Sequence, residues 1–105
     1  MVSTFAGTTQ PGDREGSGSE AAFYSPVGIA IDKAGNLFVA DFGNMGIKKI
    51  TPDGHVTRYT TAAIVNVDEP GFSPFYGPYG IAVDKEGSLF VTEYTTHKVK
   101  KISID

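Results

Sequence analysis

Short apolar runs separated by polar turns recur along the chain, and this pattern predicts β-strands. The runs over 28–32 and 36–41 are nearly continuous in apolar residues, and Gly35 lies in the tight turn between them. Strands of this kind are typically buried on both faces. The next two runs, 46–51 and 55–60, mix lysine, arginine and threonine with aliphatic residues, so they are expected to be less buried. No stretch has the period of an amphipathic helix.

The same pattern occurs twice, because residues 23–53 align with residues 75–105 without a gap. Sixteen of these 31 paired positions are identical. The second copy repeats three strands, over 80–84, 88–93 and 98–104. A repeat of about 50 residues fits a propeller blade or a large solenoid repeat. The rise in polarity from the first strand to the fourth favours a blade whose first strand lies near a central axis, because blades stacked around an axis bury both sheet faces.

The first copy contains a pattern of glycine, aliphatic and turn residues made up of Pro26, Gly28-Ile29-Ala30, Asp32, Gly35-Asn36-Leu37-Phe38-Val39-Ala40-Asp41, Asn44, Ile47, Lys49-Ile50, Pro52-Asp53-Gly54 and Val56. In this pattern the copy resembles the NHL-repeat family of β-propellers. The second copy keeps most of this pattern but has Glu93 in place of Asp41 and Thr96 in place of Asn44. The segment from Gly16 to Phe23 is similar to the glycine-rich loop that precedes the first strand in bacterial NHL repeats. The resemblance implies an all-β fold with four antiparallel strands per blade.

Two blades per chain follow from the number of predicted strands. The segment Val2-Ser3-Thr4-Phe5 is similar to Val56-Thr57-Arg58-Tyr59, which belongs to the fourth strand of the first blade. The chain 1–105 is therefore interpreted as a single two-blade unit. It has a separate fourth strand at 2–6, a complete blade at 27–60 and a three-stranded blade at 79–104.

Two blades cannot surround an axis, so we expect the ring to close by homo-oligomerisation. The fourth strand of one copy would complete the three-stranded blade of the next. The closure residues are Val2, Ser3, Thr4 and Phe5 on one side and Val99, Lys101 and Ile102 on the other. NHL-type propellers are usually six-bladed, which favours a cyclic trimer over a tetramer with eight blades. The alternative is a fragment of a longer propeller, trimmed or engineered at a closure point.

Composition and charge argue against several classes of protein. Hydrophobic residues make up 40% of the chain, which is enough for the core of one small domain. The net charge of −3 does not suit nucleic-acid binding. No apolar run approaches the roughly 20 residues of a membrane helix, and residues 1–20 do not resemble a signal peptide. Cysteine is absent, which excludes thiol chemistry, and the compartment is not indicated.

The long connections over 6–25 and 61–77 are expected at the same end of the blades, where they form one elaborate face. Eight of the twelve aromatic residues map to this end. Aromatic side chains bind ligands at low entropic cost, which suggests a peptide or glycan ligand. The candidate ligand-binding residues are Phe42, Tyr76, Tyr79, Tyr94 and His97. Phe23 and Phe75 occupy equivalent repeat positions and are expected to pack loops onto the blades.

No catalytic residue, cofactor or metal site is predicted. His55 and His97 are expected at opposite ends of the blades, so they cannot share a metal ion. Asp32 and Asp84 precede equivalent tight turns, where a carboxylate accepts hydrogen bonds from turn amides. Asp41 and Asn44 are interpreted as turn residues, and a solvated outer surface is expected for Lys48, Lys49, Lys100 and Lys101.

The leading hypothesis is therefore a non-catalytic, self-assembling propeller scaffold whose loop face binds protein, peptide or glycan. One alternative is a segment of a bacterial NHL-type sensor or adhesion protein. The other is a segment of a metal-dependent propeller lyase or lactonase. That enzyme reading follows from the resemblance alone and requires histidines and carboxylates from several different blades.

Overall fold

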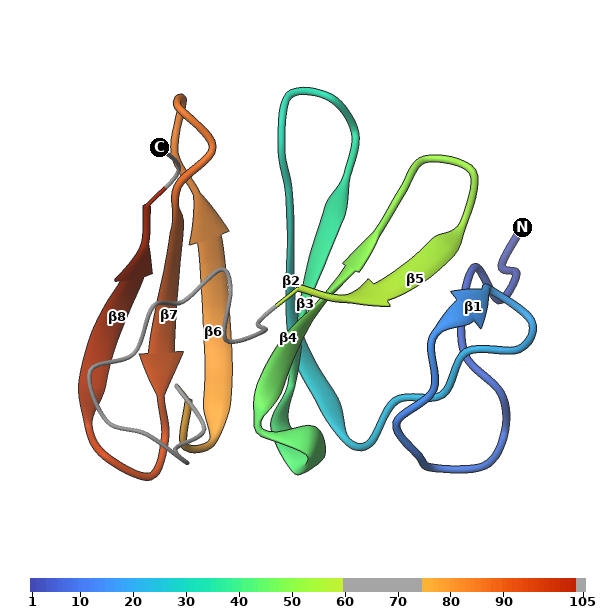
Figure 1. Ribbon diagram of the computed structural model, residues 1–105, viewed down its shortest axis with the longest axis horizontal. Helices are drawn as coiled ribbons and strands as arrows, with labels where there is room; N and C mark the ends of the chain where they lie inside the picture. The colour runs from blue at the N-terminus through green and yellow to red at the C-terminus, as the bar shows by residue number, and fades with distance from the viewer. Residues whose placement is uncertain (60–74, 104–105) are drawn as a thin grey trace.

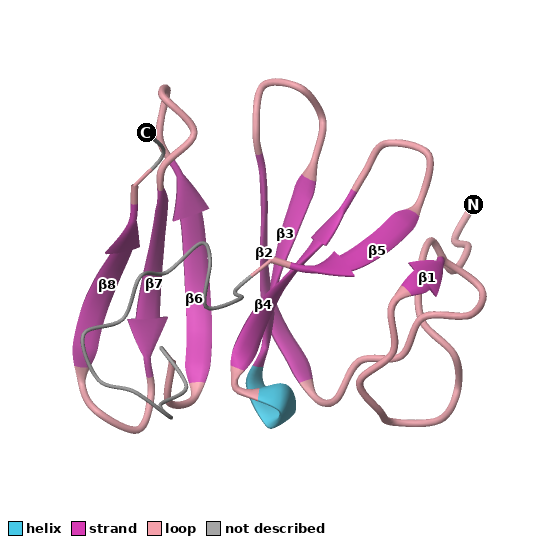
Figure 2. Cartoon of the chain, in the orientation of Figure 1, coloured by secondary structure: helices cyan, strands magenta, loops and turns pink. Residues whose placement is uncertain are grey.

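The computed structural model describes residues 1–59 and 75–103, and in these residues the chain forms two antiparallel sheets (Figure 1). The first sheet, blade 1, has the strand order β1-β5-β4-β3-β2, and the second, blade 2, has the order β6-β7-β8. The strands of blade 1 are β1 (Gly16–Ser17), β2 (Pro26–Ile31), β3 (Leu37–Asp41), β4 (Gly46–Ile50) and β5 (His55–Arg58). Those of blade 2 are β6 (Pro78–Val83), β7 (Leu89–Glu93) and β8 (Lys98–Ile102). A short 3-10 helix, η1 (Phe42–Asn44), follows β3 (Figure 2).

The strands predicted in both repeat copies are formed, and their ends differ slightly from the expected ones. The first strand of each blade begins two residues earlier, at Pro26 and at Pro78. The fourth strand of blade 1 ends at Arg58. The last strand of blade 2 ends at Ile102, and residues 104–105 lie outside the described residues. Most of the predicted connection 61–77 also lies outside them, since residues 60–74 are not described.

The N-terminal part of the chain differs from the prediction in two ways. Residues 2–6 form no strand within the single chain, and Val2 is 98% exposed. Because the predicted partner of this segment is another copy, its pairing stays a prediction. The segment from Gly16 to Phe23 is more than a loop, since Gly16 pairs with Val56 in β5 and adds a fifth strand to the outer edge of blade 1.

The tight turns between the first two strands of each blade are held by aspartates, as predicted. In blade 1, the backbone and side-chain amides of Asn36 donate to Asp32 over 2.9 and 3.1 Å. In blade 2, the backbone amides of Ser88 and Glu86 donate to Asp84 over 2.9 and 3.0 Å. Partial burial raises the pKa of Asp32, but the hydrogen bonds from Asn36 and the turn amides outweigh it and hold the pKa below its ordinary value.

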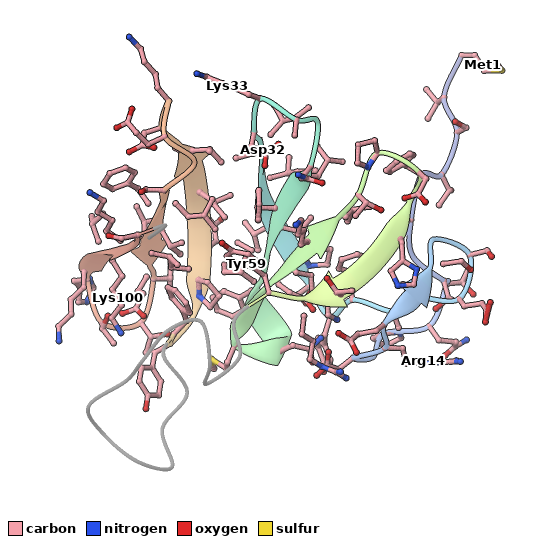
Figure 3. The ribbon with its side chains drawn as sticks, turned by 45° about the horizontal axis from the view of Figure 1, so that its top comes forward. Met1, Arg14, Asp32, Lys33, Tyr59 and Lys100 are labelled. Carbon is pink, nitrogen blue, oxygen red and sulfur yellow. The ribbon has the colours of Figure 1, made fainter. Side chains whose placement is uncertain are left out.

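The two blades pack face to face through one apolar interface. Blade 1 contributes Phe38, Ala40 and Ile47, and blade 2 contributes Leu89, Val91 and Ile102, with Phe75 from the segment before β6. Each of these seven residues is at most 5% exposed. Tyr59, which follows β5, lies between the blades (Figure 3) and packs edge-on against Phe38, with ring centroids 5.0 Å apart. We call this contact the internal blade interface.

The blades approach most closely where β2 and β6 lie side by side (Figure 1). A Cβ atom on Gly28 of β2 would lie 2.3 Å from the carbonyl oxygen of Tyr79 on β6. That distance is far below van der Waals contact, and the obstacle is backbone. Glycine at this position therefore sets the separation of the two first strands.

Gly28→Ala is expected to destabilise the chain by about 1–3 kcal/mol, because the new methyl group forces β2 away from β6. Urea unfolding of the variant measures this loss. Gly80→Ala is the control, since Gly80 is the repeat equivalent of Gly28 and has no positive φ, and a Cβ atom there meets only the side chain of Thr92, which can rotate away. If the two variants lose the same stability, the close approach of the strands does not matter.

Candidate interaction surfaces

A buried lysine stabilises the end of blade 1 at which η1 lies. The ammonium nitrogen of Lys48 is 3.0 Å from Asp41 Oδ2 and 2.9 Å from Asp13 Oδ1. It also donates a hydrogen bond to the carbonyl of Ala22 over 2.7 Å. Lys48 is 2% exposed, so the expectation that it lies on a solvated outer surface is wrong. The lysine is buried because it balances the charge of Asp41, which is itself fully buried.

Asp41 connects this lysine to the loop that leads into β2. Its Oδ1 accepts the backbone amide of Tyr24 over 2.8 Å, and its Oδ2 accepts the side-chain amide of Asn44 over 2.6 Å. Asn44 also donates to the carbonyl of Gly12 over 2.8 Å. Asp41 is therefore a buried acceptor that connects the loop before β2, η1 and β4. The interpretation of Asp41 as a simple turn residue is incomplete.

Blade 2 keeps this arrangement with different side chains. Glu93 replaces Asp41, and its Oε2 lies 2.9 Å from the ammonium nitrogen of Lys100. The backbone amide of Tyr76 donates to Glu93 over 3.0 Å, and the hydroxyl of Thr96 donates to its other oxygen. Glu93 is 3% exposed. The two departures from the family pattern therefore compensate each other: Glu93 is longer than Asp41, and its partner Thr96 is shorter than Asn44.

Glu93 makes the stability of the chain depend on pH. Burial raises the pKa of Glu93, but hydrogen bonds from Thr96, Lys100 and the Tyr76 amide, together with the charge of Lys100, outweigh it and hold the pKa below 4.5. A group with a lowered pKa in the folded state stabilises the fold above its unfolded pKa. That contribution is lost as the pH falls through the folded pKa.

We therefore expect the free energy of unfolding to fall as the pH drops below 4.5. Glu93→Gln should show a smaller loss, because the amide keeps an acceptor for the Tyr76 backbone and does not titrate. Denaturant unfolding at pH 7 and at more acidic pH, on both proteins, gives the comparison. Identical pH dependence in the two proteins would show that Glu93 does not contribute.

Three of the five predicted ligand-binding residues form a cluster at one end of the blades. The ring of Phe42 lies 6.3 Å from Tyr79 and 6.2 Å from Tyr94, both edge-on, and the two tyrosine rings are 5.7 Å apart. Tyr94 is 67% exposed and Tyr79 is 47% exposed. The cluster joins the two blades, because Phe42 comes from η1 and the tyrosines from β6 and the turn after β7. We call it the aromatic cluster.

Tyr76 and His97 are placed by other contacts. The backbone N–H of Tyr76 donates a hydrogen bond to Glu93, and the ring of Tyr76 lies 5.8 Å from the ammonium nitrogen of Lys100. His97 is exposed, has a φ of +60° and donates its amide to the carbonyl of Glu93 over 3.1 Å. Phe75 is 2% exposed in the internal blade interface, which confirms its packing role. Phe23 packs against the opposite face of blade 1 and has Lys48 over its ring at 5.0 Å.

Each blade also has an outer face that the rest of the described chain covers only in part. On blade 1 this face is a groove of about 470 Å³, and Ile29, one of the residues that line it, is 60% exposed. The groove is lined by Thr4, Phe5, Ala6, Phe23, Pro26, Val27, Gly28, Ile29, Leu37, Val39 and Ile50. On blade 2 the outer face carries Phe90, Thr92 and Val99, and Val99 is 69% exposed. Both faces therefore present exposed apolar side chains, and on blade 2 Lys101 lies beside them.

The two outer faces are repeat equivalents of the two halves of the internal blade interface. Leu37, Val39 and Ile50 in the groove occupy the same repeat positions as Leu89, Val91 and Ile102. Phe90, Thr92 and Val99 occupy the same positions as Phe38, Ala40 and Ile47. The outer face of blade 2 is therefore equivalent to the inner face of blade 1. The groove on blade 1 is equivalent to the inner face of blade 2, against which the inner face of blade 1 packs.

No three histidine, aspartate or glutamate side chains come together as a metal site in residues 1–59 and 75–103. The part of the chain that the structure describes has no helix of the length and apolarity needed to cross a membrane.

Two packed antiparallel sheets, related by a 52-residue repeat and joined through matching faces, define a propeller-like repeat protein. The sequence model of the NHL repeat matches residues 23–50. Human NHL repeat-containing protein 2 is 32% identical over 100 residues, which cover 90% of this chain and 14% of that protein. The chain therefore belongs to the NHL-repeat family.

Solved structures agree with this fold. An auxiliary nutrient binding protein from Bacteroides ovatus superposes with a TM-score of 0.75 at 24% identity, covering 94% of this chain and 28% of that one. Virginiamycin B lyase from Staphylococcus aureus superposes with a TM-score of 0.54 at 20% identity, covering 74% of this chain and 23% of that one. At these identities the likeness shows the fold alone. The chain spans about 14% of the length of its human relative and about a quarter of these structures.

Proposed function

We propose that the protein is a non-catalytic, self-assembling propeller scaffold whose copies pack head to tail through the outer blade faces. The observation that carries this proposal is the equivalence of these two faces to the internal blade interface. Packing one copy on the next would cover Ile29, Ile31 and Val99, which are each at least 60% exposed in the single chain. Apolar surface contributes about 25 cal/mol for each Å² that is buried, which favours such packing.

The absence of a catalytic role is part of the proposal, and the carboxylates of the blades support it. Asp41 and Glu93 each form an ion pair with a lysine of the same blade. Asp32 and Asp84 accept hydrogen bonds from turn amides. These four acids therefore already have structural partners. The alternative is a segment of a propeller lyase, because one solved neighbour that shares this fold is named a lyase.

Head-to-tail contacts use two different surfaces, so they close into a ring when the rotation per copy divides a full turn. Because NHL-type propellers are usually six-bladed, three copies are the favoured ring and four copies the alternative.

Light scattering coupled to size-exclusion chromatography tests the assembly. We expect a mass three times the 11.1 kDa of one chain, or four times for the larger ring. A mass of 11.1 kDa over the whole accessible concentration range would refute self-assembly.

A second candidate function is the binding of a peptide or glycan at the aromatic cluster. Three rings from both blades meet there, and the two tyrosines are well exposed. Rigid aromatic side chains of this kind bury large areas on binding at a small entropic cost. One solved neighbour is named a nutrient binding protein, which is consistent with a binding role for this fold.

Tyr94→Ala is expected to weaken the binding of any ligand found on peptide or glycan arrays by about tenfold or more, because truncation of an aromatic residue at the centre of a binding site typically costs about 2 kcal/mol or more. Tyr24→Ala is the matched control, since Tyr24 is 50% exposed and belongs to the loop before β2. Equal losses in the two variants, or no binding by the unaltered chain, would contradict a site at the aromatic cluster.

A further inference from the structure

We infer that residues 2–5 of one copy add to the edge of β8 in a second copy, antiparallel, with Val2 opposite Ile102, Ser3 opposite Lys101 and Thr4 opposite Lys100. This inference rests on the proposed head-to-tail assembly and specifies its backbone contact. The occupant of the β8 edge is thus a second copy of this chain.

The register follows from the pairing that blade 1 already shows. In that blade, β4 and β5 pair with Ile50 opposite Val56, Lys49 opposite Thr57 and Lys48 opposite Arg58. β8 lies 52 residues after β4, and Val2-Ser3-Thr4-Phe5 is similar to Val56-Thr57-Arg58-Tyr59. Carrying each partner over to its equivalent gives the register above. The backbone bond from Tyr59 N–H to the Ile47 carbonyl, 2.9 Å long, has Phe5 N–H to the Val99 carbonyl as its counterpart.

The edge of β8 is available for such pairing. β8 is the last strand in the order β6-β7-β8, so one of its edges has no neighbouring strand among the described residues. Lys98 and Val99 of this strand are both exposed, Val99 to 69%. Unpaired strand edges present a row of backbone donors and acceptors that readily accept another strand. In blade 1 the equivalent edge, that of β4, is covered by β5.

The side chains of the N-terminal segment fit the same equivalence. Val56 is fully buried, whereas its counterpart Val2 is 98% exposed in the single chain. Tyr59 packs edge-on against Phe38, and their counterparts are Phe5, which is 54% exposed, and Phe90 on the outer face of blade 2. Phe5 also lines the groove on its own blade 1. In the inferred assembly, Phe5 therefore lies between two copies, just as Tyr59 lies between the two blades of one chain.

The pairing has to join different copies. Figure 1 shows the N-terminal residues and β8 at opposite ends of the longest dimension of the chain, which extends over 41 Å. Figure 3 shows the same separation between the labelled Met1 and Lys100. A segment of five residues cannot cross blade 1 and blade 2 to reach the β8 edge of its own chain.

Disulfide trapping tests the register, because the chain contains no cysteine of its own. Ser3→Cys with Lys101→Cys places two thiols opposite each other at a hydrogen-bonded position, where Cα atoms are about 5.5 Å apart and a disulfide can form. Thr4→Cys with Lys101→Cys is the matched control, since neighbouring residues of a strand point to opposite faces. We expect oxidation to yield covalent trimers or tetramers from the first pair and monomers from the control.

The result separates the register from the assembly. Equal cross-linking of the two pairs, a disulfide within one chain, or no disulfide in a protein that light scattering shows to be multimeric would overturn the register and leave the assembly standing. A chain that is monomeric by light scattering in the reduced state, in the unaltered protein as well as in the variant, would overturn both.

Discussion

Phe90→Glu is expected to convert the assembled protein into monomers while the single chain remains folded. Phe90 is already 36% exposed on the outer face of blade 2, where Lys101 lies 5.5 Å from its ring. Its repeat equivalent Phe38 is 4% exposed inside the internal blade interface. If Phe90 takes the same place in the groove of the next copy, Phe90→Glu removes that apolar contact and forces a carboxylate to lose its hydration against an apolar surface. Lys101, its cross-strand neighbour, offsets only part of that cost.

Light scattering measures the expected drop to the mass of one chain, and circular dichroism checks that the β-structure persists. Tyr94→Glu is the matched control, because it also replaces an exposed aromatic with a glutamate but lies in the aromatic cluster, away from the outer faces. We expect the control to keep the assembled mass. Assembly that survives Phe90→Glu, or that is lost equally in both variants, would show that the outer face of blade 2 is not an interface.

The internal repeat made most of the fold predictable from the sequence. The two copies predict the same strand positions independently, so within the repeat copies the errors are limited to the ends of strands. β1 was not predicted, because Gly16 and Ser17 have little tendency to form a strand. The strand exists through distant contacts, in which the guanidinium of Arg58 on β5 lies 3.1 Å from Asp13 and 3.2 Å from Glu15. Such pairing depends on how the N-terminal loop folds back, which local patterns do not reveal.

The buried ion pairs could have been found from the repeat. Lysine is seldom fully buried, so Lys48 on a mixed strand was naturally interpreted as a surface residue. In both copies, however, an acid precedes a lysine by seven residues, Asp41 before Lys48 and Glu93 before Lys100. The pair Asp41 and Asn44 in the first copy corresponds to Glu93 and Thr96 in the second. The acid becomes longer where its partner becomes shorter, which indicates that the two side chains are in contact.

The aromatic cluster was predictable only in part. Strand directions place the connections after β3 and β7 at the same end, so Phe42 and Tyr94 were expected on one face. Their contact with Tyr79 depends on how blade 2 sits on blade 1, which is set by the packing of Phe38, Leu89 and Val91. The sequence therefore predicts that Phe42 and Tyr94 lie on one face, whereas their contact with Tyr79 depends on the internal blade interface.

Asp41→Ala is expected to cost about 3–5 kcal/mol of stability, the largest effect among single substitutions away from the apolar core. The change leaves the buried ammonium of Lys48 with only Asp13, which is 42% exposed, and one carbonyl. It also removes the acceptor for the Tyr24 amide and for the side chain of Asn44. Unfolding in guanidinium chloride gives the loss directly, and Asp32→Ala is the control. That turn aspartate has neutral partners only, so its loss should be near 1 kcal/mol per hydrogen bond.

The double variant Asp41→Leu with Lys48→Met shows what the ion pair contributes. Breaking a buried pair leaves an uncompensated charge, whereas replacing both partners with apolar side chains removes that penalty. We therefore expect the double variant to be more stable than Asp41→Ala, although Tyr24 and Asn44 still lack their acceptor. If the double variant is as unstable as the single one, the cost lies in the lost hydrogen bonds, and Asp41 acts mainly by fixing the loop before β2. If Asp41→Ala loses no more stability than Asp32→Ala, the buried pair does not stabilise blade 1.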